Sequence, residues 1–470
     1  MGGLSKKAYQ FSKLKKEKGL PTLIVDGGSL LFKTNHRLAG SGAGQARITA
    51  ETIVKAYNLI GYDAVGIGRR DLAAGLDFLL EIRDKSRFDW LSANIIDMDT
   101  DKPLFKPFVT RQLGELSLGI IGLTGQIRSD SKLLDGNVAV EPWRDNLPSI
   151  ISKLETSHDF LILLTDLNAG DCREIAEMYP MINLIVQARE VDTGKPPIYL
   201  TDSAILVGAG QKGKHIGVME VDWRPARKWR TAGQQALSAG KKERTRLQSQ
   251  MKHLRERPEL KNHYENNRER LAALENTLAE LERQEKSAAG SVSSFDNRFM
   301  AMNVSLPDHR AVLDLVNENK KSVKAWNRKS PPSTGDGMPA RGFVGWTSCR
   351  NCHREQVKSW QAGRHATSHL TLVEKGQQFN LECLPCHVTG ADRNDPAAAI
   401  GRAADLQVVG CESCHGPGST HSLNPSSQRT VPITEKICLA CHTPEQDDSF
   451  DFDGGLKKLK CEIRDDRAGD

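Results

Sequence analysis

Eight of the ten cysteines in the chain form four Cys-x-x-Cys pairs, and a histidine directly follows each pair. The four sets are Cys349, Cys352 and His353; Cys383, Cys386 and His387; Cys411, Cys414 and His415; and Cys438, Cys441 and His442. Cys-x-x-Cys-His is the attachment signature of c-type haem, in which two thiols form thioethers and the adjacent histidine ligates the iron. The pattern predicts four covalent haems, with these cysteines as attachment sites and these histidines as proximal ligands.

Two other uses of paired cysteines fit the pattern less well. Cys-x-x-Cys pairs also bind zinc, and four pairs could make two zinc ribbons, but a ribbon has no need of the histidine. A disulfide scaffold would not place a histidine after every pair either. Cys172 and Cys461 stand outside the motifs. We therefore favour haem over zinc.

The motif segment offers three further histidines as distal iron ligands, His365, His369 and His421. His421 follows His415 by only six residues in a turn-rich stretch, so we expect it to ligate a neighbouring haem. His369 lies one helical turn after His365 and competes with it. Four irons and three distal histidines leave at least one iron open, unless a reserve such as Met338 or His309 ligates it.

The same segment resembles the tetrahaem cytochrome family of nitrifying bacteria, which accepts electrons from hydroxylamine oxidoreductase. The resemblance covers the last quarter of the chain and rests on Trp360 with His365, on 383–390, and on 409–421. It implies electron transfer among closely stacked haems that are mostly bis-histidine. It also implies one haem without a distal ligand, and the haem attached at Cys383 and Cys386 is the one we expect to be open.

Composition is that of a globular chain, with 38% hydrophobic and 26% charged residues among 470. No apolar run approaches the roughly 20 residues that span a bilayer, so we expect no transmembrane segment. The formal net charge of +6 is small, and Lys and Arg alternate with Glu on expected helices, which favours solvated faces over nucleic-acid binding. The length predicts two or more domains.

Residues 1–235 alternate strand-like and helical patterns and predict an α/β domain built on a large sheet. One of the expected strands runs from Leu91 to Ile96. Residues 236–290 are rich in Lys, Arg, Glu and Leu and predict an antiparallel helical hairpin, with a dimerising coiled coil as the alternative. Residues 291–340 form a return segment and linker. Residues 341–470 then form a small, mainly α tetrahaem cytochrome c domain.

The front domain resembles the 5′-nucleotidase branch of the calcineurin-like metallophosphoesterases. The resemblance is carried by 62–68, 75–79, Leu91-Ser92-Ala93-Asn94 and 119–125. It implies a sandwich of two sheets flanked by helices. In that family two divalent cations, held by Asp, Asn and His, polarise the phosphate and deprotonate the attacking water.

The sequence departs from the family pattern at the metal-ligand positions. Gly28-Ser29 stands for Gly-Asp, Gly68-Arg69-Arg70-Asp71 for Gly-Asn-His-Glu, Asp166 for a lone histidine, and Ala188-Arg189-Glu190-Val191 for Gly-His-x-His. Arginine cannot ligate a cation because it stays protonated. We therefore expect a degenerate domain that has lost its metal site.

The three arginines at these positions suggest another use of the site. If Arg69, Arg70 and Arg189 converge, their guanidinium groups would form a site for phosphate, another oxyanion or a nucleotide. The alternative is that they are solvated or paired with Asp71, Asp166 and Glu190.

Together these features predict a multihaem c-type cytochrome that carries electrons between redox partner proteins, fused to a phosphoesterase-like domain. The alternatives are a 5′-nucleotidase-like hydrolase, or a haem reductase of a small nitrogen or sulfur oxyanion. Haem attachment to this motif takes place outside the cytoplasm, so we expect a periplasmic or cell-surface protein. The stretch after Met1 lacks the apolar core of a signal peptide, and we expect that its start is truncated or misassigned.

Overall fold

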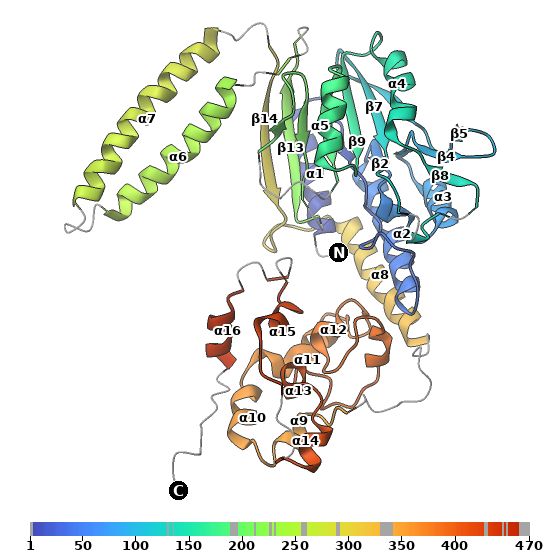
Figure 1. Ribbon diagram of the computed structural model, residues 1–470, viewed down its shortest axis with the longest axis vertical. Helices are drawn as coiled ribbons and strands as arrows, with labels where there is room; N and C mark the ends of the chain where they lie inside the picture. The colour runs from blue at the N-terminus through green and yellow to red at the C-terminus, as the bar shows by residue number, and fades with distance from the viewer. Residues whose placement is uncertain are drawn as a thin grey trace. The chain divides into compact units, whose positions relative to one another are not determined.

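The structure is a computed structural model that describes residues 3–128, 131–134, 136–188, 196–210, 213–224, 228–229, 232–254, 261–287, 292–329, 342–426, 431–443, 446–447 and 450–459 (Figure 1). The chain forms two compact units. Unit 1 consists of Met1–Arg37 and Ala56–Val312, and unit 2 consists of Leu38–Lys55 and Leu313–Asp470.

Unit 1 is built on a six-stranded sheet in the order β11-β12-β10-β9-β7-β6. Its strands are β6 Phe108–Leu113, β7 Leu116–Leu123, β9 Phe160–Thr165, β10 Ile182–Gln187, β11 Ile198–Tyr199 and β12 Ile205–Val207. Strands β7, β9, β10 and β12 are parallel, whereas β6 and β11 are antiparallel to their neighbours. A second, three-stranded parallel sheet consists of β1 Val25–Asp26, β2 Ala64–Gly66 and β3 Asp89–Leu91.

Strand β9 shows how the two sheets form a sandwich. All six of its residues are buried, as expected for a parallel strand covered on both faces. Leu161 and Leu163 point into one apolar cluster with helices α4 (Trp143–Leu154) and α5 (Ala169–Met178). Phe160, Ile162 and Leu164 point into another, which also contains Ala64 and Leu91 from the second sheet.

The remaining elements of unit 1 surround this sandwich. They are α1 Leu4–Lys18, the last residues of α2 Gly42–Ile60, η1 Arg69–Leu72, α3 Leu76–Lys85, and a small sheet of β4 Ile95–Asp97, β5 Lys102–Pro103 and β8 Val138–Val140. Strands β13 His215–Asp222 and β14 Ser294–Ala301 pair as an antiparallel ribbon. The mixed α/β fold is the one expected for the front domain.

Helices α6 (Ala232–Leu254) and α7 (Lys261–Ser287) follow β13 and precede β14 in the sequence, and they run side by side in opposite directions (Figure 1). Leu247 and Leu278 are buried, and a Cβ added at Gly240 would lie 2.6 Å from Leu278. The ion pair of Lys241 with Glu282 spans the two helices at 3.1 Å.

The expected strand from Leu91 to Ile96 is wrong, because the structure has two strands there in different sheets. Strand β3 ends at Leu91 and β4 begins at Ile95. Between them, the buried Asn94 donates to the carbonyls of Thr124 and Glu141 and accepts from the amide of Thr124. These side-chain bonds, together with main-chain bonds from Ser92 to Lys106 and from Ala93 to Gly122, hold the segment in which the chain changes sheets.

Unit 2 contains many short helices. They are α9 Trp346–Cys349, α10 Arg354–Gln361, η4 Arg364–Thr367, α11 Ser368–Glu374, α12 Leu384–His387, η5 Pro396–Ala399, α13 Cys411–His415, α14 Ser419–Leu423, α15 Glu435–Leu439 and α16 Phe452–Leu459. Most of α8 (Arg310–Lys329) and the first residues of α2 also belong to this unit.

A buried amide network joins α2 and α8 to the motif segment. Asn327 donates to Gln45 and to the carbonyl of Phe379, both at 2.7 Å. Gln45 in turn donates to Asn380 at 2.7 Å and accepts from the amide of Leu381 at 2.9 Å. The unit that holds the motifs therefore extends beyond residues 341–470.

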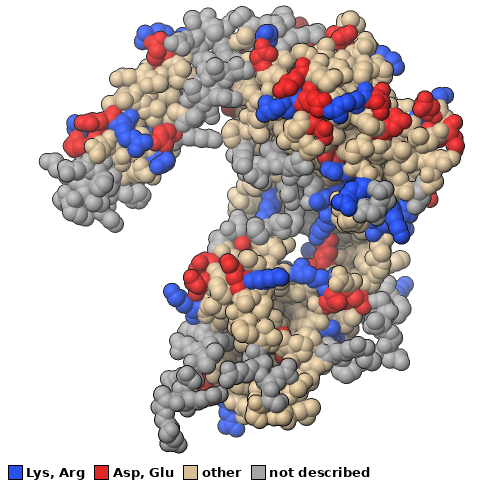
Figure 2. All heavy atoms as spheres, viewed as in Figure 1, with Lys and Arg blue, Asp and Glu red and all other residues tan. Residues whose placement is uncertain are grey.

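Lys and Arg side chains are interspersed with Asp and Glu on the face seen in Figure 2. Several form exposed ion pairs within a helix, such as Lys85 with Glu81 and Arg283 with Glu280. Within the described ranges, no helix combines the length and apolar character required to cross a bilayer.

Candidate functional sites

Each Cys-x-x-Cys-His motif folds as a helical turn. The amide of His353 donates to the carbonyl of Cys349 at 2.9 Å, and His442 bonds to Cys438 in the same way at 2.9 Å. The turns at His387 and His415 lie in α12 and α13. Residues i, i+3 and i+4 share one face of a helix, so each turn directs two thiols and one imidazole to the same side. This is the arrangement that one covalent c-type haem requires.

Two of the motif histidines lie near histidines outside the motifs. The ring centroids of His353 and His421 are 6.0 Å apart, and those of His365 and His442 are 6.2 Å apart. A metal–imidazole bond is about 2 Å long, so two rings that ligate one metal from opposite sides have centroids roughly 6 Å apart. Both spacings thus fit two axial ligands of one iron.

His369 lies beside His387 of the second motif, whereas His365 lies beside His442 of the fourth motif. Burial and the nearby His387 lower the pKa of His369, whereas burial and the nearby His442 lower the pKa of His365. Both shifts favour the neutral imidazole, the form that binds a metal. Since the two residues face different proximal histidines, they need not compete for one iron.

The ring nitrogens that would face away from iron have different surroundings. His387 Nδ1 bonds to the carbonyl of Ser368 at 2.7 Å, and His442 Nδ1 bonds to the carboxylate of Asp447 at 2.9 Å. Such partners fix the tautomer and leave Nε2 for the metal. His415 Nδ1 is buried and has no hydrogen-bond partner within the described residues.

The thiols of different motifs lie close together in two pairs. The hydrogen bond between Cys349 and Cys411, together with burial, raises the pKa of Cys349. Cys441, followed by Arg393, lowers the pKa of Cys386 to about 6 against the opposing effect of burial. The first motif is therefore next to the third, and the second next to the fourth.

Buried polar bonds hold the first and third motifs in this position. Glu412 directly follows Cys411 in the sequence of the third motif. Its carboxylate accepts from the amides of Val344 and Gly345, both at 2.9 Å. It also accepts from the amide of Gly418 at 2.7 Å. One side chain thus ties the segment before the first motif to the loop after the third.

The apolar interior of unit 2 fits a large apolar cofactor. Its protein-only clusters are small, one around Leu372 and Leu384 and one around Trp360. Other apolar side chains in the motif region are exposed, including Leu423 at 87% and Val431 at 53%. The small size of the protein-only clusters, together with the thiol and imidazole geometry, fits a fold that packs around covalent haem.

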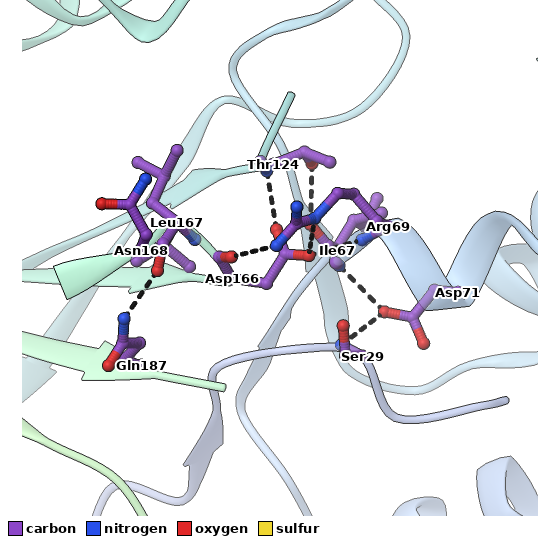
Figure 3. A network of polar contacts seen from close by, with 12 residues as sticks. Ser29, Ile67, Arg69, Asp71, Thr124, Asp166, Leu167, Asn168 and Gln187 are labelled. Atoms are coloured by element: carbon purple, nitrogen blue, oxygen red, sulfur yellow. Dashed lines mark hydrogen bonds and ion pairs between the residues drawn. The ribbon is translucent and has the colours of Figure 1, made fainter. Parts of the chain in front are cut away.

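In unit 1, the candidate site lies where parallel strands end. Ser29 follows β1, Arg69 and Asp71 follow β2, and Thr124 and Asp166 follow β7 and β9 (Figure 3). The carboxyl ends of parallel strands are where open α/β sheets bind ligands. The fold therefore retains the place of a site.

Arg69 and Asp166 pair with each other at that place (Figure 3). Arg69 Nε donates to Asp166 Oδ2 at 2.9 Å, and Arg69 Nη2 donates to the Asp166 carbonyl at 2.9 Å. The Arg69 amide also donates to Oδ2, and the Gly125 amide donates to Oδ1. The Asp166 carboxylate is thus fully engaged by cationic and amide donors.

Asp71 has an environment of its own. Its fully buried carboxylate accepts from the amides of Ser29 and Leu31 at 2.8 Å and of Gly68 at 2.9 Å. Burial raises the pKa of Asp71 to about 7, although the bonds from Leu31 and Gly68 oppose the rise. Asp71 is not paired with Arg69, and its bonds fix the turn that carries Ser29.

The three arginines that were predicted to bind an anion differ in their surroundings. Arg69 pairs with Asp166, which is the alternative to anion binding that the sequence left open. Arg70 lies next to it in η1 and is half-buried. Arg189 and Glu190 lie outside the described residues. Across the described ranges, no three His, Cys, Asp or Glu side chains gather where they could hold a metal ion.

Sequence reasoning missed Asp447 and Glu412 as neighbours of the motifs. Glu412 occupies a variable position of its motif, and Asp447 follows its motif by five residues. The Cys-x-x-Cys-His signature does not specify the residue at either position, so it did not predict these hydrogen bonds.

Comparison with known proteins gives a match in unit 2. The family model described as "Cytochrome c554 and c-prime" matches residues 348–416. Cytochrome c-554 of Nitrosomonas europaea is 33% identical over 172 residues, which cover 25% of this chain and 73% of that protein.

Unit 1 matches a different group of proteins. A 5′-nucleotidase of Vibrio parahaemolyticus is 34% identical over 101 residues, which cover 21% of this chain. The match spans only 18% of that nucleotidase. Among solved structures, a 5′-nucleotidase precursor from Thermus thermophilus has a TM-score of 0.47 at 14% identity, over 78% of this chain and 62% of that one. Both parts of the chain thus have relatives of the kinds that the sequence suggested.

Proposed function

Because this chain belongs to the cytochrome c-554 family, we propose that unit 2 carries four covalent c-type haems and transfers electrons between redox partner proteins outside the cytoplasm. Haem irons supply this chemistry by cycling between the ferric and ferrous states, each taking up one electron. The observation that carries the proposal is the spacing of about 6 Å in the pairs His353 with His421 and His365 with His442.

The arrangement of ligands supports a carrier rather than a catalyst at most of these irons. An iron held by two of these histidines, such as His353 with His421, would have no position left for substrate. The contacts of Cys349 with Cys411 and of Cys386 with Cys441 bring the motifs together as two pairs. Haems attached at these neighbouring thiols would be held close to each other, as electron transfer between them requires.

Counting ligands leaves one iron without a distal histidine. With His421 and His365 assigned to the irons of His353 and His442, His369 remains for the irons of His387 and His415. The family resemblance implies that the open iron is the one at His387. The proximity of His369 to His387 supports the other assignment, in which the iron of His415 is open.

Carbon monoxide tests the ligand count, because it binds an open ferrous iron readily and a bis-histidine iron only after a ligand leaves. The reduced protein should show a carbon monoxide difference spectrum of about one haem in four. His369→Ala should raise this fraction to about two in four. As a matched control, His36→Ala changes an exposed histidine of unit 1 and should have no effect. A spectrum with no reactive fraction would show that every iron has two ligands.

For unit 1, we propose a scaffold or binding domain that has lost the hydrolytic metal site. Arg69 stands where the related enzymes have a metal ligand, and arginine cannot ligate a metal ion because it stays protonated. Its guanidinium instead pairs with the Asp166 carboxylate. Incubation of the wild type with Mn²⁺ or Zn²⁺ and a nucleoside monophosphate should release no phosphate above that of a blank without protein. Metal-dependent release by the wild type would favour the hydrolase instead.

A further inference from the structure

The proximal histidine of the fourth motif has an acidic partner. Asp447 Oδ2 lies 2.9 Å from His442 Nδ1, and the amide of Asp447 donates to the carbonyl of Thr443 at 2.8 Å. The ring of Phe450 lies against the other side of His442, with centroids 4.4 Å apart and planes at 20°. The carboxylate is thus positioned by its own turn, and the imidazole is fixed between two neighbours.

The second motif provides the contrast within the same unit. There, His387 Nδ1 faces the neutral main-chain carbonyl of Ser368 at 2.7 Å. A carboxylate attracts the Nδ1 proton more strongly than a carbonyl does, so the imidazole donates more electron density through Nε2. A more electron-rich ligand stabilises ferric over ferrous iron.

We propose that Asp447 lowers the reduction potential of the haem attached at Cys438 and Cys441 by accepting the Nδ1 proton of His442. This inference rests on the proposed ligation of that iron by His442. The step affected is the uptake of one electron by ferric iron to give ferrous iron, and the Nδ1 proton stays within the hydrogen bond. Asp447 is a positioning residue, since it acts on the iron only through His442.

The alternative is an ordinary surface ion pair, because His442 and Asp447 are about one third exposed at the side chain. In that case Asp447 would act as a charge near the haem, without polarising the ligand. Asp451 distinguishes the two roles. It lies four residues further along, is exposed, and its Oδ2 accepts from the amide of Gly454 at 2.7 Å.

The test is a spectroelectrochemical titration of the haem-loaded protein with dithionite as reductant, after intact mass has shown four covalent haems. Asp447→Asn keeps an oxygen acceptor but removes the charge. One of the four one-electron components should shift to a more positive potential by about 59 mV, a tenfold change in its equilibrium constant, and the other three should stay in place. The low-spin ferric resonance signal of the same haem should change with it.

Two further variants decide the interpretation. Asp447→Glu should restore the wild-type potential, whereas Asp451→Asn should leave all four components unchanged. With four haems present, a titration unaltered by Asp447→Asn would overturn the inference and leave the proposed function intact. An equal shift in Asp451→Asn would also overturn it, since charge alone would then be the cause. Absence of the fourth covalent haem would instead contradict the proposed function.

Discussion

At the scale of residues, Arg69 and Asp166 form the central ion pair of the candidate site in unit 1. The Asp166 side chain is 5% exposed and accepts from the guanidinium and two main-chain amides. A buried carboxylate needs compensating positive charge, which a metal ion could supply. In this chain the neighbouring guanidinium supplies it.

Arg69→Ala should therefore destabilise unit 1. The substitution leaves the buried carboxylate with amide donors alone, at a cost of about 1–3 kcal/mol in the free energy of unfolding. Chemical denaturation of the full chain measures the loss. Arg283→Ala is the matched control, because Arg283 is 79% exposed and its pair with Glu280 should contribute less than about 0.5 kcal/mol. Equal stability of the two variants would contradict the role given to Arg69.

Asp71 predicts a pH dependence of stability. Its pKa is about 7 in the folded chain against an ordinary value of 3.8, so the folded state binds the proton more tightly. The stability contributed by protonated Asp71 is fully present below about pH 4 and is lost as pH rises through 7. The unfolding free energy of the wild type, relative to Asp71→Asn, should fall across this window.

The exposed Asp84 provides the control for that measurement. Its side chain is 69% exposed, so Asp84→Asn should give a stability difference that stays nearly constant from pH 4 to pH 7. If the stability difference between the wild type and Asp71→Asn also stayed constant from pH 4 to pH 7, the three amide bonds would fully offset the effect of burial on the pKa of Asp71.

At the scale of elements, the helical turns of the four motifs could be predicted from sequence. Their geometry is local, because spacings of three and four residues on one turn bring the thiols and imidazole together. The pairing of motifs could not be predicted, since it depends on contacts such as Glu412 with Val344, 68 residues apart. The break between Leu91 and Ile95 was missed for a similar reason, because Asn94 bonds to distant Thr124 and Glu141.

Glu412→Ala should loosen the connection between the first and third motifs. Three main-chain amides lose their acceptor, two of them before the first motif and one after the third. We expect a loss of about 1–3 kcal/mol, measured as a lower urea midpoint of the Soret band. Glu355→Ala, at an exposed position in the first turn of α10, should change the midpoint much less. Matching midpoints would show that Glu412 does not organise the motifs.

At the scale of the whole molecule, the sequence indicated a two-sheet front domain, a helical hairpin and a haem segment. It did not indicate that the haem-binding unit takes in Leu38–Lys55 and most of α8. Gln45 and Asn327 are 282 residues apart, and nothing in the local pattern of either predicts their bond. The extent of a unit depends on such distant contacts, whereas the residues predicted to attach haem lie within short local motifs.

Covalent haem content tests the central claim most directly. The chain should be produced in a host that exports it and attaches c-type haem, and its intact mass should be measured after denaturation, which removes any cofactor that is not covalently bound. Replacing Cys438 and Cys441 together by Ala should remove one haem, and replacing the non-motif Cys172 by Ala should remove none. The account predicts a mass increase of four haems in the wild type. An unmodified polypeptide mass, with zinc released on denaturation, would contradict it.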